Sequence, residues 1–207
     1  MKTKKLSEEL EHILSTSQGE RRIAAFLKKH PDIVFWTFLR IGGHLHYVVP
    51  EFQLGKHFQA DFLLLQSYSG GWHIHLVELE PVVDTLFNKD GSPSKRLRHA
   101  QKQIADWRMY KDTEGSSLRI QLAEAAKVSG GLQMDLRSTE PSSFSGKNLR
   151  DPLTFIDWHY HIVIGRRALL SETAQMNRTR GMPYDHIDIA TYDRFLDVVC
   201  GREKRSQ

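Results

Sequence analysis

Three carboxylates, Asp61, Glu78 and Glu80, are the residues of this 207-residue chain whose types and spacing best suit chemistry. In the stretch WHIHLVELE at 72–80, strand alternation places Glu78 and Glu80 on one face, after three apolar residues. In HFQADFLLLQ, Asp61 precedes an apolar run, although aspartate is a poor strand residue. Carboxylates that lie close together repel one another unless a cation or a proton shares the site. The three residues therefore form a candidate cation site.

A turn between the two stretches would bring the first two carboxylates together. The segment SYSGG at 67–71 has the composition of a hairpin turn. Positions 61 and 78 are symmetric about a point inside this turn, so an antiparallel pairing sets Asp61 beside Glu78. The alternative is that the glutamates emerge into water at a strand end and that Asp61 lies at an edge or bulge.

A site with only oxygen ligands suits Mg²⁺ or Mn²⁺ rather than zinc. Such a cation binds a phosphate oxygen and activates water for attack on phosphorus. A basic flank fits phosphodiester hydrolysis, since the segment from Lys89 to Lys111 has seven basic residues and two acidic ones. A solvated helix face is the other interpretation of that charge. The candidate phosphate-binding residues are Lys89, Lys95, Arg96 and Lys102.

The elements that must position these residues follow from periodicity and from turn residues. Apolar residues at helical spacing predict helices within 1–30, the second of which ends near Pro31. Residues 33–80 are predicted to be β-structure, with strands at 45–53, 57–66 and 72–80. Ser92 and Pro93 are predicted to open a helix at 93–112. The remaining predicted elements are a helix at 117–128, a loop at 138–152, a strand at 155–165, a helix at 168–178, a strand at 186–190 and a helix at 192–200.

This order predicts an α/β domain with a mixed sheet. We expect one domain over 1–207, with N-terminal helices in 1–30, a core in 31–200 and a frayed tail in 201–207. Hydrophobic residues make up 40% of the chain and charged residues 26%, as is typical of a globular protein. No apolar run has the length of a membrane span, and no signal peptide is evident. Because Cys200 is the single cysteine and rules out an intrachain disulfide, we expect a reducing, cytoplasmic setting.

The wider context of the carboxylates resembles a known family. Asp61 followed by Glu78-Leu79-Glu80 resembles the D…(D/E)xK signature of the restriction-endonuclease-like superfamily. The stretch VELEPVVDTLFNKDGSPSKRLRHAQKQIADWRMY resembles the Shedu-type (DUF4263) nuclease domain, including an A-x-x-Q-x-x-x-W helix at Ala100, Gln103 and Trp107. The resemblance covers residues 15–112, and IDIATYDRFLDVV resembles the closing strand and helix of that family.

The resemblance implies a restriction-endonuclease-like αβββαβ core, with a central mixed sheet flanked by helices. It also implies a Mg²⁺- or Mn²⁺-dependent endodeoxyribonuclease or nickase of bacterial anti-phage defence. Asp61, Glu78 and Glu80 are then the expected metal ligands. DNA is the expected partner, homo-oligomers are common among related nucleases, and a protein partner or assembly could activate so short a chain.

Glu80 departs from the family pattern, which usually has lysine at this position. A lysine would orient the attacking water and stabilise charge on the phosphate. Glutamate can instead bind metal or act as a base, and a basic group such as Lys89, Lys95 or Lys102 could replace the missing lysine. A catalytically impaired module of the same fold, which binds nucleic acid or a partner protein, is the alternative function.

Two further residues could assist catalysis. Glu20 lies on the apolar stripe of the second predicted helix, and superfamily members often supply a glutamate from such a helix. The alternative is a capping box in which Glu20 bonds the amide of Ser17. By resemblance, Gln103 contacts the phosphate, the metal ligands or the water, and its alternative is a polar residue beside a core stripe. Trp107 is predicted to lie in the core.

Four histidines alternate on two predicted strands, at positions 73, 75, 159 and 161. Pairs of this kind can bind metal. We interpret them as half-buried strand residues, because no third ligand type accompanies them at a useful spacing.

Overall fold

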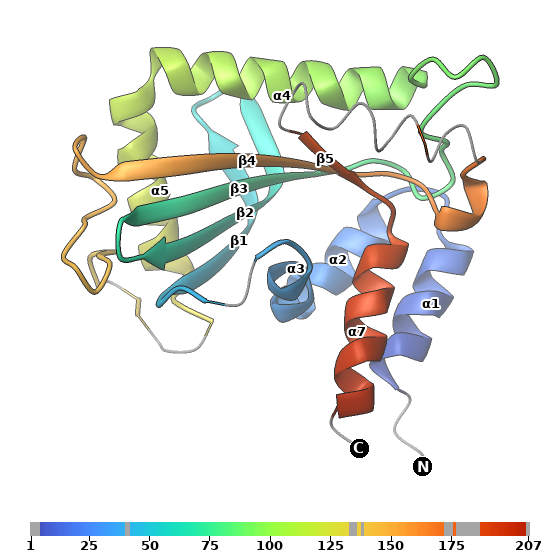
Figure 1. Ribbon diagram of the computed structural model, residues 1–207, viewed down its shortest axis with the longest axis horizontal. Coiled ribbons are helices and arrows are strands. Elements are labelled where there is room, and N and C mark those ends of the chain that lie inside the picture. Colours follow the sequence, from blue (N-terminus) through green and yellow to red (C-terminus); the bar gives the residue numbers. More distant parts are fainter. Residues whose placement is uncertain are drawn as a thin grey trace. The chain divides into compact units, whose positions relative to one another are not determined.

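The computed structural model describes residues 5–39, 42–132, 136–137, 139–171, 176 and 187–205 (Figure 1). Its elements, in chain order, are α1 (Leu6–Thr16), α2 (Arg21–Lys29), α3 (Pro31–Phe38), β1 (His46–Leu54), β2 (Phe58–Tyr68), β3 (Gly71–Leu79), α4 (Lys95–Thr113), α5 (Gly115–Ser129), β4 (Phe155–Val163), η1 (Arg167–Leu169), β5 (Ile187–Ala190) and α7 (Asp193–Arg205).

The sheet has the strand order β1-β2-β3-β4-β5. It is a mixed sheet with flanking helices, which confirms the predicted α/β class and is consistent with a restriction-endonuclease-like core. Strands β3 and β4 are neighbours in the sheet, although α4 and α5 lie between them in sequence (Figure 1). Segments far apart in the chain therefore meet along this pair of strands.

The β2–β3 hairpin is the element that positions the carboxylates. The two strands are antiparallel, with Phe62 paired to Val77 and Tyr68 paired to Gly71, so Ser69 and Gly70 form the turn. This register has the symmetry that the sequence predicted. Gly71 also needs to be glycine, because a Cβ there would collide with the carbonyl oxygen of Phe155 at the start of β4.

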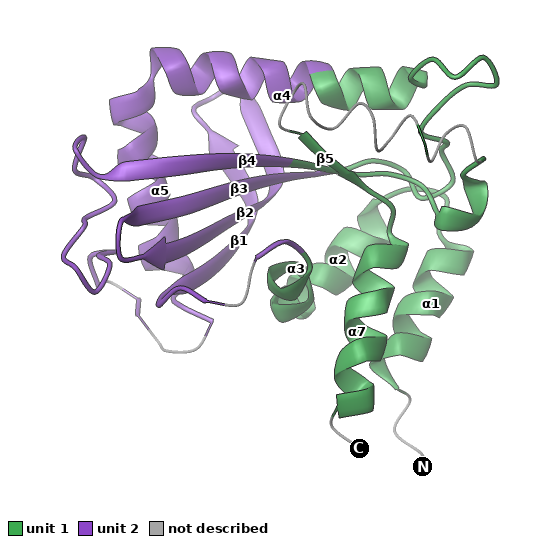
Figure 2. Ribbon diagram, viewed as in Figure 1, with its two compact units in different colours: residues 1–37, 79–101, 161–207 green, residues 38–78, 102–160 purple. Residues whose placement is uncertain are grey.

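The chain divides into two compact units, which Figure 2 colours separately. Unit 1 comprises residues 1–37, 79–101 and 161–207, and unit 2 comprises residues 38–78 and 102–160. Strands β3 and β4 and helix α4 contribute residues to both units. The single domain over 1–207 stays a prediction, because compact units of this size can belong to one domain.

Each unit has its own buried side chains. In unit 2, the rings of Tyr47 and Trp72 lie 6.3 Å apart, and Trp107 is fully buried, as predicted. In unit 1, helices α1 and α7 lie side by side, and Leu10 and Phe195 are fully buried. In the described part of the chain, no helix is both long and apolar enough to cross a membrane.

The prediction of β-structure from residue 33 onward is wrong for the segment Pro31–Phe38, which is helix α3. Its apolar residues run continuously instead of alternating, so periodicity did not separate a helix from a buried strand. Pro31 and the acidic Asp32 in the first turn are a helix-start signal. The apolar residues that follow them made the segment resemble a strand.

Two other boundaries differ from prediction. Helix α4 begins after Ser94, whose Oγ accepts a hydrogen bond from the amide of Leu97 at 3.1 Å. Ser92 instead donates to Asp90 from its amide and its hydroxyl. Helix α7 continues to Arg205, so residues 201–205 are not a frayed tail. The predicted helix at 168–178 falls mostly outside the described residues. At the start of this segment, Arg167–Leu169 form the short helix η1.

Candidate metal sites

Asp61 and Glu78 lie on neighbouring strands of unit 2. Asp61 and Glu78 directly adjoin Phe62 and Val77, the last pair of the hairpin register, and continuing that register by one residue would set them opposite each other. Residues opposite each other in an antiparallel pair point to the same face, with Cα atoms about 4.5–5.5 Å apart. Both side chains are half-buried. Like charges directly opposite one another destabilise a sheet, so a shared cation suits this donor set.

Gln103 belongs to the same unit as this pair. Its Nε2 atom donates a hydrogen bond to the carbonyl oxygen of Gln59, at 3.3 Å. Gln59 precedes Asp61 by two residues on β2, so the two side chains share a face of the strand. Helix α4 therefore places an amide side chain against the strand segment that holds Asp61.

Glu80 belongs to unit 1, where its backbone is held on both sides. Its amide donates to the carbonyl oxygen of Val163 at 2.8 Å, and its carbonyl accepts from the hydroxyl of Tyr192 at 2.8 Å. The residue is only 4% exposed. A buried carboxylate in a fixed backbone needs a partner that compensates its lost hydration.

Among the residues that the structure describes, an exposed histidine pairs with the Glu80 carboxyl. His99 Nδ1 lies 3.5 Å from Glu80 Oε1, at the limit of a hydrogen bond. Burial raises the pKa of Glu80; His99 and Arg96 oppose this shift, and the charge of Glu20 adds to it. A bound cation would favour the ionised form, so this carboxyl fits a metal ligand or a proton acceptor.

Glu20 is near enough to Glu80 to raise its pKa. The alternative of a capping box with Ser17 is wrong. Helix α2 begins at Arg21, so Glu20 occupies the N-cap position and makes no side-chain cap. Ser17 instead ends α1, and its amide donates to the carbonyl oxygen of Ile13 at 3.0 Å. Glu20 is half-buried and remains a candidate assistant within unit 1.

The four residues predicted to bind phosphate are all exposed. Arg96 forms an ion pair with Asp84, in which Nε and Oδ2 are 3.4 Å apart. Lys89, Lys95 and Arg96 belong to unit 1, and Lys102 belongs to unit 2. Their role in binding DNA stays a prediction.

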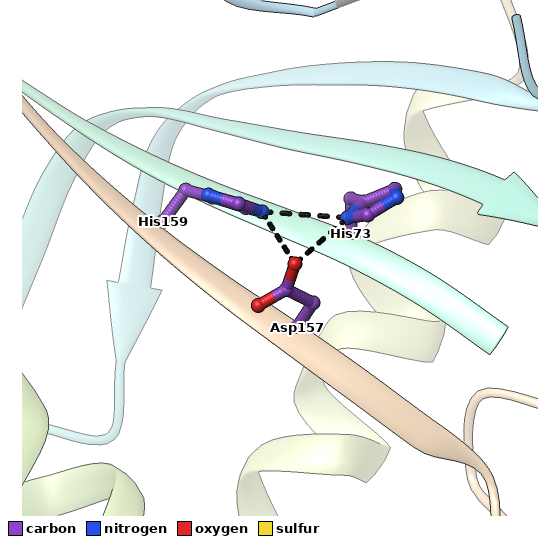
Figure 3. Close-up of side chains that lie close together, drawn as sticks. All are labelled: His73, Asp157 and His159. Carbon is purple, nitrogen blue, oxygen red and sulfur yellow. Dashed lines mark hydrogen bonds and ion pairs between the residues drawn. The ribbon is translucent and has the colours of Figure 1, made fainter. Parts of the chain in front are cut away.

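A second constellation, which the sequence interpretation missed, lies in unit 2 (Figure 3). His73 on β3 and Asp157 and His159 on β4 turn one ligand atom each toward a common point. Asp157 is the third ligand type that seemed absent, and it precedes His159 by two residues, on the same strand face. These three side chains could hold a metal ion.

The remaining strand histidines have different surroundings. His161 is buried in unit 1, and its Nδ1 lies 3.2 Å from Asp188 Oδ2. Arg194 forms an ion pair with the same carboxylate. Burial raises the pKa of Asp188, but the hydrogen bonds from His161 and Arg194 outweigh it and hold the pKa well below its usual range. This arrangement is a satisfied buried network, as the sequence interpretation favoured.

A model of the C-terminal region of the Shedu protein SduA matches residues 17–196. The chain belongs to the Shedu family. The matched stretch includes every candidate residue described above, from Glu20 to Asp188. No curated protein matches this Shedu-family chain. Membership of the family points to anti-phage defence.

Proposed function

We propose that this Shedu-family chain is a divalent-metal-dependent nuclease that hydrolyses phosphodiester bonds of DNA in anti-phage defence. The observation that carries the proposal is the β2–β3 hairpin register, whose last pair, Phe62 and Val77, directly adjoins Asp61 and Glu78. Two carboxylates fixed in this way by two paired strands are a preformed set of oxygen ligands, of the kind that Mg²⁺ and Mn²⁺ prefer.

Asp61 and Glu78 bind the cation in this proposal. When bound, Mg²⁺ would polarise the scissile phosphate and make a coordinated water more acidic. Gln103, which already contacts the strand of Asp61, orients the water or a phosphate oxygen through its amide. The water adds to phosphorus, one P–O ester bond breaks, and solvent protonates the leaving oxygen.

Glu80 is proposed as the group that takes the proton of the attacking water or as a third ligand. It follows Glu78 by two residues, which is the basis for assigning it to the same reaction. Its raised pKa supports proton transfer, since a carboxyl with a pKa nearer neutrality is a better general base. Glu20 assists by adding negative charge near this carboxyl.

Contacts with DNA are proposed for Lys89, Lys95, Arg96 and Lys102. Exposed cations of this kind bind phosphates without reading sequence, so binding is expected to weaken steeply with salt. Homo-oligomerisation or an activating protein partner would then control when the nuclease cuts.

Plasmid cleavage in MgCl₂ tests the proposal. The wild type should nick or linearise supercoiled DNA, and Asp61→Asn should lower the rate at least about 100-fold, because a metal ligand is lost. Asp112→Asn is the matched control, since Asp112 is an exposed carboxylate of the same unit and pairs with Lys111. Equal cleavage by the wild type and Asp61→Asn, or none by the wild type with Mg²⁺ or Mn²⁺, would refute the assignment.

A second candidate function rests on Glu80, which stands where the family usually has lysine. A buried carboxyl with a raised pKa cannot supply the positive charge of that lysine. The chain would then bind DNA or a protein without cutting. Glu80→Lys distinguishes the two functions: it should create cleavage in a binding module and abolish cleavage in a nuclease that uses Glu80.

A further inference from the structure

The described residues contain a second group of metal-ligating side chains, and its ligand types differ from those of the nuclease proposal. The group has two imidazoles and one carboxylate, from His73, His159 and Asp157. Two histidines and one carboxylate are a common ligand set for first-row transition metals, whereas Mg²⁺ takes oxygen ligands.

The three ligand atoms form a nearly regular triangle. His73 Nδ1 lies 3.3 Å from Asp157 Oδ2, His159 Nε2 lies 3.0 Å from the same oxygen, and the two nitrogens are 3.3 Å apart. In a tetrahedral site, ligand atoms bound about 2.0–2.2 Å from a common ion are about 3.3–3.6 Å from one another. An ion above this triangle can therefore lie at coordination distance from all three atoms, with a slight widening of the separation between His159 and Asp157.

Packing holds both rings in this orientation. The ring of Tyr68 stacks on His73, with centroids 4.5 Å apart and planes 27° apart. The ring of His75 stacks on His159, at 4.3 Å and 17°. The close approach of Gly71 to the carbonyl of Phe155 fixes β3 against β4 at this end of the strands. Preorganised ligands lose less conformational entropy when a metal binds.

The triangle is open to solvent on one side. The side chains of His73, His159 and Asp157 are 32%, 37% and 44% exposed. Water can therefore supply the remaining ligand of a tetrahedral ion, and a metal can enter from solution.

This site cannot share an ion with the carboxylate pair of the hairpin. His73 precedes Glu78 by five residues on β3, which corresponds to about 17 Å along the strand. Because five is an odd number, the two side chains point to opposite faces of the sheet. A metal at the histidine triangle is thus independent of the proposed nuclease chemistry.

We propose that His73, Asp157 and His159 form a zinc site that pins β3 to β4. The ligands come from strands that are distant in sequence, so an ion here ties together two parts of unit 2 and stabilises the folded chain. Without metal, His73 Nδ1 and His159 Nε2 would donate hydrogen bonds to the Asp157 carboxylate. The experiment must therefore distinguish this hydrogen-bonded arrangement from metal binding.

Calorimetric titration of the full chain with ZnCl₂, in excess MgCl₂, tests this site. The magnesium occupies sites with only oxygen ligands and leaves the histidine triangle free for zinc. The wild type should bind one zinc per chain, and the double variant His73→Gln/His159→Gln should bind at least about 100-fold more weakly. His57→Gln, which removes an exposed histidine in the β1–β2 turn, should leave the affinity unchanged.

A second measurement uses the wild type alone, so it does not depend on a variant that folds. In nuclear magnetic resonance spectra of the histidine rings, zinc should shift Nδ1 of His73 and Nε2 of His159. Plasmid cleavage in Mg²⁺ without zinc should continue in the double variant, which separates this proposal from the nuclease assignment. Absence of zinc binding by the wild type, equal binding by the double variant, or shifts confined to other histidines would overturn the proposal.

Discussion

The two ends of the β2–β3 hairpin present different ligands on opposite faces of the sheet. Near the open end, Asp61 and Glu78 offer only oxygen atoms. Near the turn, His73 meets Asp157 and His159 from β4. Carboxylates alone select hard cations, and imidazoles shift the preference toward zinc and its neighbours. Strand β3 can therefore contribute to two sites that do not compete for one metal.

Removing an oxygen ligand should give the largest effect and should act on one site only. Glu78→Gln is expected to weaken Mn²⁺ binding at least about 100-fold, because one of two facing carboxylates is lost. Zinc affinity should stay within about two-fold, since the triangle is on the other face. Parallel calorimetric titrations with MnCl₂ and ZnCl₂ measure both affinities. A loss of zinc binding in this variant would show that the two sites are coupled.

A substitution of His161 compares a buried histidine that is hydrogen-bonded to a carboxylate with the histidines of the proposed zinc site. His161→Gln removes a buried hydrogen bond to the Asp188 carboxylate, so the free energy of unfolding should fall by about 1–3 kcal/mol. Zinc affinity should not change, because His161 is not one of the three side chains of the triangle. Urea unfolding and zinc titration are the two measurements. Weaker zinc binding by this variant would mean that the triangle does not define the site.

Burial of the Glu80 carboxyl should lower the free energy of unfolding by an amount that depends on pH. Glu80→Gln is expected to raise the free energy of unfolding of the metal-free protein by about 1 kcal/mol at pH 7. A carboxyl whose pKa is higher in the folded state binds its proton more tightly there. The loss of stability from burying the ionised carboxyl is therefore absent below the ordinary pKa of a glutamate, and it grows as the pH rises toward the higher pKa of the folded state.

Thermal unfolding of both proteins between pH 4 and pH 7 checks this expectation. The difference in melting temperature should be near zero at the acidic end and should widen in favour of the variant as the pH rises. A wild type that is more stable than Glu80→Gln at pH 7 would mean that its ionised carboxyl is well compensated in the folded chain. Cleavage activity should nevertheless fall in the variant, because glutamine cannot accept the proton.

The smallest effect should come from the exposed cations. Lys95→Ala removes one proposed phosphate contact, so the slope of log affinity for duplex DNA against log salt should fall by about 0.9. Both metal affinities should be unchanged, because Lys95 is an exposed residue of α4 and no ligand. Fluorescence anisotropy at several salt concentrations measures the slope. An unchanged slope would remove Lys95 from the DNA-binding surface.

The sequence predicted the hairpin register that brings Asp61 near Glu78, and missed the histidine group, for a physical reason. Asp61 and Glu78 belong to one hairpin, so the turn alone determines their register. His73 and His159 are 86 positions apart, and only the pairing of β3 with β4 unites them. The spacing of Asp157 and His159 on one strand face was a usable signal. Helix α3 was missed because its continuous apolar residues suit a buried strand equally well.

Crystals soaked in MnCl₂ and measured at the manganese absorption edge show whether Asp61 and Glu78 hold a divalent metal ion. We expect an anomalous peak within coordination distance, about 2.1–2.3 Å, of both the Asp61 and Glu78 carboxylates. Asp61→Asn crystals should lack that peak and should keep any peak at the histidine triangle. A wild-type map with no manganese between Asp61 and Glu78 would contradict the proposal that this pair holds the catalytic metal.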